Sequence, residues 1–261
     1  MRKLWQDAKN HISETHFPHP FALQYLGLRT TVGAIGVLLP WILVFGNQWV
    51  FDSQRIESSL SAYYYTGMRD VFVGALCAIA VFMASYRGRD LIDNWAANLA
   101  CLFALLVAWF PTTPDDKTLA PKWIGQAHYT SAAFLFITLA IFCIFLLGKT
   151  DSPAAKGTPK KKARDAIHIS CGVVILICIL AASIAGGLPD DSHIHSYDPI
   201  LWAEAIAISA FGLSWFVAGK AFRILKDPWE YGSSPPDPWQ NCTGAPRNAA
   251  HSNASGLTPP R

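Results

Sequence analysis

Six long runs of mostly apolar residues dominate the first 222 positions of the chain. Each run holds about 17 to 23 residues, and a helix of about 20 apolar residues is long enough to cross the ~30 Å hydrocarbon core of a membrane. The predicted spans are Thr30–Phe51, Arg69–Tyr86, Asn94–Pro111, Ala127–Leu147, Ile167–Leu188 and Ile200–Phe222. The sequence therefore predicts an all-α fold, an integral membrane bundle of about six transmembrane helices.

Composition agrees with a membrane protein. Charged residues make up only 15% of the chain and hydrophobic residues 52%, whereas a soluble domain usually carries about 25% charge. The net charge of +3 is too small to favour nucleic acid, so the expected surroundings are membrane lipids and no nucleic-acid partner is predicted. The six cysteines form no CxxC pair, so they indicate neither a zinc site nor a disulfide framework.

The basic residues predict the orientation of the bundle. Of the 21 Lys and Arg residues, 17 lie in the amino-terminal segment, the second and fourth connections and the carboxyl-terminal tail, which share one side of the membrane. Cytoplasmic loops carry such an excess, so both termini are predicted to be cytoplasmic in a multi-pass protein of the cell inner (plasma) membrane. Three parts are expected: a cytoplasmic or interfacial segment over 1–28, the six-span domain over 29–222, and a cytoplasmic tail over 223–261.

The tail and the small residues of the spans bear on partners. Pro, Gly and Ser are frequent in the tail, which predicts disorder, and its repeated Asp227-Pro228-Trp229 and Asp237-Pro238-Trp239 leave a protein partner open. Ala182 and Gly186, four residues apart in the fifth span, allow close approach of two helices. That spacing serves packing within the bundle or a homo-oligomer, and the sequence does not separate the two.

Polar residues gather at the predicted non-cytoplasmic mouth, where a pocket is expected. The candidate pocket residues are Ser61, Tyr65, Arg69, Asp70, His128 and Glu204. Glu204 lies about 6 Å inside the sixth span, and a carboxylate at such depth normally faces a partner within the protein. Arg69 and His128, which open neighbouring spans at similar depth, are the expected partners. The alternatives are a structural ion pair and a proton, metal or substrate site.

The last outer loop has the composition of a metal site. His193 and His195 are flanked by Asp190, Asp191 and Asp198. In an extended segment, side chains two residues apart point the same way, so the two imidazoles could share a divalent metal, completed by His128 or Glu204. Histidine also titrates near pH 6.5, so a pH-sensing role is equally compatible.

Two resemblances bear on the fold. The segment Ser59-Leu60-Ser61-Ala62-Tyr63-Tyr64-Tyr65-Thr66, running into Arg69-Asp70-Val71-Phe72-Val73-Gly74, resembles a loop-to-helix signature of an uncharacterised family of bacterial polytopic membrane proteins. The resemblance extends over about residues 55 to 221 and implies no named activity. It implies that the six candidate pocket residues form a set on one side of the membrane.

The chain has only weak similarity to the superfamily of alkaline ceramidases and adiponectin receptors, which are seven-span zinc hydrolases. That family carries a Ser with a His four residues later, whereas Ser61 is followed at that distance by Tyr65. The last span lacks the family's HxxxH pair, and six spans are visible rather than seven.

Three functions follow from these observations and stay open. The first is proton-linked transport of a small solute or ion, with Glu204 as the titrating group and Arg69 as its counter-ion. The second is a metal-dependent intramembrane hydrolase acting on a lipid-like substrate, with His128, His193 and His195 holding the metal that activates water. The third is a non-catalytic membrane scaffold or assembly subunit.

Overall fold

The structure is a computed structural model that describes residues 20–53, 55–88, 90–114, 121–149, 157–189 and 192–225. The predicted amino-terminal segment as far as residue 19, Asp190, Asp191 and the tail from residue 226 lie outside the described residues. The two Asp-Pro-Trp copies therefore lie outside them as well.

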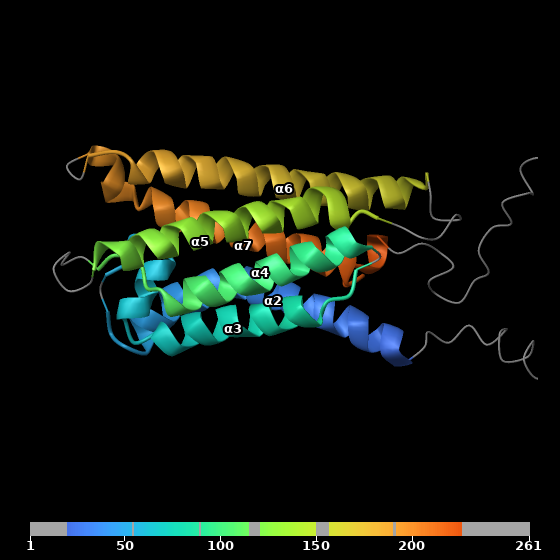
Figure 1. Cartoon of the computed structure of the whole chain (residues 1–261), viewed down its shortest axis with the longest axis horizontal. Coiled ribbons are helices and arrows are strands. Elements are labelled where there is room, and N and C mark those ends of the chain that lie inside the picture. The colour runs from blue at the N-terminus through green and yellow to red at the C-terminus, as the bar shows by residue number, and fades with distance from the viewer. Residues whose placement is uncertain are drawn as a thin grey trace, which may run out of the picture.

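All regular secondary structure among the described residues is helical, with no strand, which confirms the all-α prediction. Six long helices run side by side along the long axis (Figure 1). They are α2 (Pro20–Trp49), α3 (Arg69–Ser85), α4 (Leu91–Trp109), α5 (Lys122–Ile141), α6 (Pro159–Gly186) and α7 (Pro199–Ala218). A π-helical segment, η2 (Phe142–Leu146), continues α5, and the 3₁₀ helices η1 (Ser61–Tyr65), η4 (His193–Tyr197) and η5 (Arg223–Leu225) lie in connections or after α7.

The first helix begins ten residues before the predicted span, at Pro20 rather than Thr30. Pro20 suits a first helical position because its missing N–H would have no partner in the first turn. Helix α6 likewise begins at Pro159, eight residues before the predicted span, where Thr158 accepts a hydrogen bond from the Lys161 N–H. The first turns of α6 are charged and have no hydropathy signal, whereas residues 20–29 of α2 mix apolar residues with polar ones.

Five helical segments are long and apolar enough to cross a membrane. They are Leu26–Trp49, Leu91–Trp109, Lys122–Leu146, Pro159–Gly186 and Pro199–Ala218. Their outward faces expose large apolar side chains such as Ile177, Leu180 and Leu213. Soluble monomers rarely expose contiguous apolar surface on this scale, so the chain has the character of a multi-pass membrane protein. Helix α3 is apolar too, with 17 residues.

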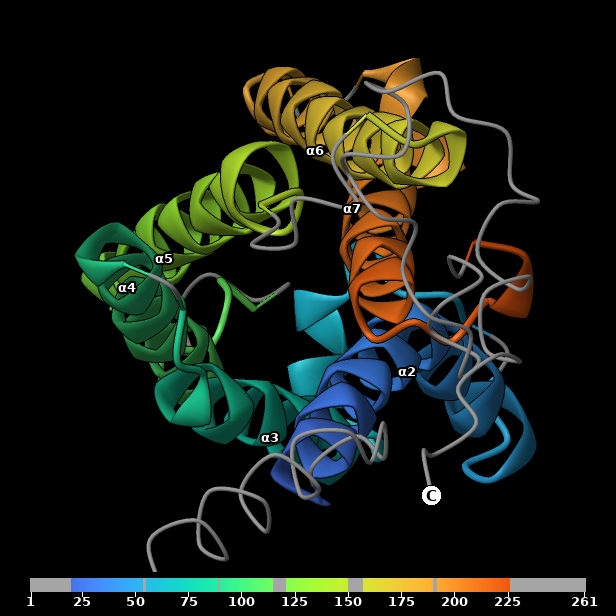
Figure 2. The ribbon, with the colours of Figure 1, turned by 90° about the vertical axis from the view of Figure 1, so that its right-hand side faces the viewer.

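The helices form a closed ring. Each long helix packs on the next along the chain, and α7 packs on α2 to close the circle (Figure 2). Glycines allow that last contact: a Cβ added to Gly36 would lie 3.0 Å from the Gly212 Cα, and one added to Gly33 would lie 2.8 Å from the Gly212 carbonyl oxygen. Gly172 of α6 similarly packs on Ala140 and Ile144 of the α5–η2 unit. Small residues therefore serve packing within the bundle at these positions.

Candidate functional site

A cavity of about 1300 Å³ lies inside the ring at one end of the bundle. Its walls come from α5, α6 and α7, and η1 with the residues just before it forms a roof. The deepest lining side chains are Phe136 on α5, Cys178 on α6 and Ala207 on α7. Ligand sites in proteins usually measure about 300–1,000 Å³, so this space is large enough for a small molecule.

Glu204 ties the roof to α7. Its Oε2 accepts a hydrogen bond of 2.7 Å from the Leu60 N–H, and the backbone of Ser61 donates a second one to the carboxylate. The Leu201 N–H of α7 donates to the Ser58 carbonyl over 3.1 Å. Ser59 accepts from the Ala62 N–H at 3.0 Å, which supplies a further partner for the first turn of η1. Glu204 thus satisfies N–H groups at the start of η1 that would otherwise lack acceptors.

A second set of bonds joins the roof to the α4–α5 connection. The Tyr65 hydroxyl donates to the Thr112 carbonyl over 2.6 Å, and the Thr112 hydroxyl donates to the Tyr129 hydroxyl of α5 over 3.0 Å. Gly125 permits this arrangement, because a Cβ there would lie 2.1 Å from the Thr113 Oγ1. The polar end of the cavity is therefore a connected rim, built from three separate parts of the chain.

Three of the six predicted pocket residues line the cavity: Ser61, Tyr65 and Glu204. Arg69, Asp70 and His128 do not line it. The Arg69 guanidinium donates to the Tyr64 hydroxyl at 2.6 Å and lies over the same ring, 4.3 Å from its centre.

The prediction that Arg69 or His128 is the partner of Glu204 is wrong. Buried His128 places its Nδ1 2.6 Å from the Phe110 carbonyl oxygen, and Arg69 contacts Tyr64 instead. Within the part of the chain that the structure describes, neither residue forms an ion pair with Glu204. Backbone amides took the place of a charged partner, because the chain before α3 folds into η1 directly beside α7.

The predicted metal pair does not adopt the expected extended conformation. Residues 193–197 form η4, and with three residues per turn two positions two apart point in different directions. His195 lines the cavity, whereas His193 is exposed and packs near Tyr197. Among the described residues, which exclude Asp190 and Asp191, no three His, Cys, Asp or Glu side chains are grouped as a metal site requires.

Aromatic side chains fill the ring below the cavity. Tyr86, Phe142, Phe211 and Trp215 are buried and in contact, with the Tyr86 ring centre 5.6 Å from that of Phe142 and 5.7 Å from that of Trp215. Phe211 lies one helical turn beyond Ala207, the deepest lining residue of α7. Phe142 opens the π-helical segment η2, and π-helical turns in helices are frequent at functional sites. This cluster, the aromatic plug, lies beyond Ala207 on the side away from the roof, and none of its four residues lines the cavity.

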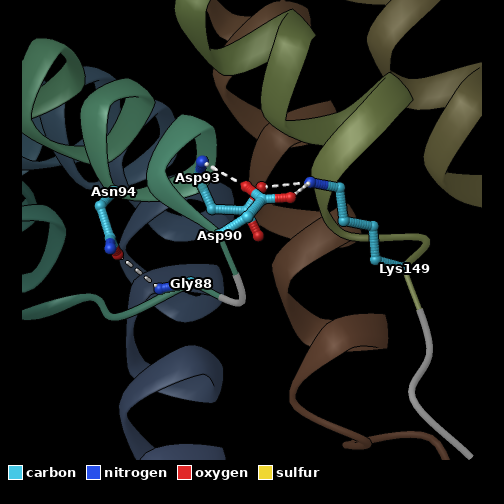
Figure 3. Close-up of polar contacts among 5 residues, drawn as sticks. All are labelled: Gly88, Asp90, Asp93, Asn94 and Lys149. Carbon is cyan, nitrogen blue, oxygen red and sulfur yellow. Dashed lines mark hydrogen bonds and ion pairs between the residues drawn. The ribbon is translucent and has the colours of Figure 1, made fainter.

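A charged clamp lies at the end of the bundle opposite the roof, between the start of α4 and the segment after η2 (Figure 3). The Lys149 ammonium, just after η2, donates to Asp90 at 2.8 Å and to Asp93 at 2.5 Å. Asp90 also caps α4 by accepting from the Asp93 N–H at 3.0 Å, and the Gly88 N–H donates to Asn94 at 2.9 Å. The hydrogen bond from Lys149 is the main reason that the pKa of Asp90 is lowered to about 2. The clamp joins the start of α4 to the end of the α5–η2 unit.

Sequence reasoning did not find the clamp, the aromatic plug, or the roles of Thr112 and Tyr129. Lys149 looked like one member of a basic loop, and the positive-inside pattern accounts for it without any partner. The Asp90-x-x-Asp93 spacing before an apolar run is a helix-start signal that could have identified the cap. Nothing in the spacing of Tyr86, Phe142 and Trp215 predicts that they meet.

Comparisons with known proteins give no match to a family model, to a curated protein or to a solved structure.

Proposed function

We propose that the protein crosses the cell inner (plasma) membrane six times, with both termini in the cytoplasm. Helix α3 is then a span in addition to the five segments named above. The 17-residue length of α3 suffices for a thin or locally thinned hydrocarbon core. The distribution of Lys and Arg supports the orientation, because the clamp and the amino terminus of α6 fall on the basic side. The cavity then opens to the non-cytoplasmic side.

Within that frame, the proposed activity is proton-linked transport of a small solute. The observation that carries it is the asymmetry of the ring: a large cavity at one end, and an aromatic plug with a charged clamp at the other. A transporter that exposes its site to one side at a time has this form in one of its two states. The π-helical segment at the plug is a place where α5 could change its winding.

Glu204 is the proposed proton carrier. Its carboxylate lines the cavity and accepts from the Leu60 backbone, and both the ionised and the protonated group can accept that bond. The negative form binds the roof more strongly, because charge-assisted hydrogen bonds are roughly twice as strong as neutral ones. Protonation would therefore loosen η1 from α7 at the mouth of the cavity, which links proton binding to opening.

The geometry supports the hydrolase alternative less well. The candidate ligands His128, His193 and His195 point to different surroundings, with His128 on the Phe110 carbonyl and only His195 at the cavity. A scaffold would not require a cavity of this volume with a connected polar rim.

The test of transport is access to the cavity from both sides. Cys178 is a native reporter that lines the cavity floor, so the other five cysteines are replaced and its labelling by a membrane-impermeant thiol reagent is measured from each side in oriented vesicles. Transport predicts fast labelling from the cavity side and slower, measurable labelling from the clamp side. Replacing Lys149 by Ala should speed the second reaction, because the clamp holds that end closed.

A matched control retains only Cys143, which is fully buried at the plug and should react slowly from either side. Two further single-cysteine variants, Lys122→Cys and Lys149→Cys, report the orientation at opposite ends. Labelling of Cys178 from one side only, in both the parent and the Lys149→Ala variant, would contradict transport.

A further inference from the structure

Helices α5 and α6, which both line the cavity, lie close together at one end only. The two helices are in close contact near η2, where a Cβ on Gly172 would lie 3.1 Å from the Ala140 carbonyl oxygen. Toward the cavity they separate: a Cβ on Gly186 would meet only the Ile200 side chain, at 3.8 Å. The axes therefore diverge from the plug to the mouth.

Four exposed residues of the cavity lining flank this gap. They are Gln126 and Tyr129 on α5, and Ser183 and Gly186 on α6, and together they define the α5–α6 portal. Tyr129 is 54% exposed, although its hydroxyl accepts a bond within the rim. Both edges belong to segments long and apolar enough to span a membrane, and Tyr129 lies about 10 Å from the start of α5. The portal therefore faces lipid rather than water.

The inside of the cavity is divided between polar and apolar ends. The roof and rim contribute hydroxyls and the Glu204 carboxylate, whereas the deeper walls consist of small apolar side chains such as Ala132, Ala182 and Ala203. A hydroxyl-rich end above an apolar chamber is complementary to a molecule with a polar head and a hydrocarbon tail. Water-soluble solutes have no such tail to bury.

We propose that the transported solute is a membrane-resident amphiphile, an acyl-chain lipid with an uncharged, hydroxyl-bearing head, which enters through the α5–α6 portal. Hydroxyl donors suit the acceptors of the rim, above all the Glu204 carboxylate. A strongly anionic head is disfavoured because Glu57 and Glu204 both line the polar end. Arg55, which does not line the cavity, lies 4.0 Å from Glu57, and among the described lining residues only Lys122 carries an ammonium or guanidinium group.

Transport of this lipid rests on the proposed function, whereas binding of the lipid in the cavity is tested separately. The full-length protein is reconstituted in vesicles that contain a photoreactive diacylglycerol, with the diazirine at the end of one acyl chain. A phosphatidate with the same chains serves as the anionic comparison. After illumination, the labelled peptides are identified by mass spectrometry.

The expected result is labelling by the diacylglycerol at the cavity floor, on peptides around Phe136 and Cys178. Ser183→Trp should lower this labelling about tenfold or more, because a bulky side chain at the portal edge blocks entry. Ile184→Trp is the matched control, since Ile184 is exposed on the same helix and does not line the cavity. On α5, Gln126→Trp and Thr130→Trp form a second pair of the same kind, which keeps the test valid if one variant folds poorly.

Equal labelling in the blocked and control variants would overturn the inference, because the probe would then be annular lipid. Equal labelling by the two lipids would overturn the uncharged head. If labelling fails while Cys178 is reached from both sides, the protein transports a different solute. If labelling succeeds while Cys178 is reached from one side only, the cavity binds lipid without transport.

Discussion

Replacing Glu204 by Ala should loosen the roof of the cavity from α7. The change removes the acceptor of the Leu60 N–H bond at 2.7 Å and of the Ser61 backbone bond. Each buried N–H left without an acceptor costs about 1–3 kcal/mol, which gives about 2–6 kcal/mol for two. Water in the adjoining cavity replaces part of this, so the expected loss is about 2–3 kcal/mol. A loss of about 1 kcal/mol lowers the midpoint temperature of thermal unfolding by about 2–4 °C for a chain of this size, so this midpoint should fall by about 4–12 °C.

The assay is thermal unfolding of the detergent-purified protein, followed by intrinsic tryptophan fluorescence. Glu204→Gln keeps an oxygen acceptor without the charge and should cost only about 1 kcal/mol, because neutral bonds have roughly half the strength of charge-assisted ones. Arg69→Ala is the discriminating control, since Arg69 contacts Tyr64 and not Glu204. If Arg69→Ala reproduced the loss seen in Glu204→Ala, an ion pair rather than a backbone cap would be the correct account. An unchanged midpoint in Glu204→Ala would refute the cap itself.

Three further predictions concern the frame around the site. Gly36→Ala should destabilise the protein by about 1–3 kcal/mol, because the added Cβ would lie 3.0 Å from backbone atoms of α7. Gly74→Ala has open space around it and should stabilise the protein by about 0.5–1 kcal/mol. Thermal unfolding of both variants checks this. The stabilisation from Asp90 should be complete above its ordinary pKa of 3.8 and should disappear as the pH falls toward about 2, because Lys149 lowers the folded-state pKa; unfolding of the wild type and Lys149→Met across this range should converge at the acid end. Tyr65→Phe should cost about 1 kcal/mol through loss of the 2.6 Å bond to Thr112 and should increase the mobility of the roof, which hydrogen exchange at residues 58–66 measures.

Much of the fold could be predicted from the sequence, because a bilayer restricts the length and composition of the segments that cross it. A span needs about 20 apolar residues, and five of the six predicted segments correspond to helices that meet this requirement. The boundary at Pro159 was missed because the charged first turns of α6 have no hydropathy signal. The boundary at Pro20 was missed because residues 20–28 were assigned to the amino-terminal segment. The sequence predicted that Ser61, Tyr65 and Glu204 lie at the same mouth, and all three line the cavity. Ser61 and Tyr65 were placed there by the predicted outer loop and the resemblance, and Glu204 by its distance from the start of its span.

The partners within the site could not be predicted in the same way. The sequence places Glu204, Arg69 and His128 at similar depth, but depth does not say which direction a side chain takes around its helix axis. Glu204 is directed at η1, and η1 exists because residues 61–65 form a tight 3₁₀ turn that no periodicity indicates. The prediction that His193 and His195 share a metal was wrong for a related reason. Side chains two residues apart point the same way in an extended chain but not in a 3₁₀ helix.

The central claim is that protonation of Glu204 shifts the protein between two states that expose the cavity to opposite sides. The most direct measurement is the ratio of Cys178 labelling rates from the two sides of oriented vesicles, with and without an imposed proton gradient. The account predicts that acidifying the cavity side loosens the roof and raises labelling from the cavity side relative to the clamp side, and that Glu204→Gln abolishes this response. A ratio that ignores the gradient in the parent, or that responds equally in Glu204→Gln, would contradict the account.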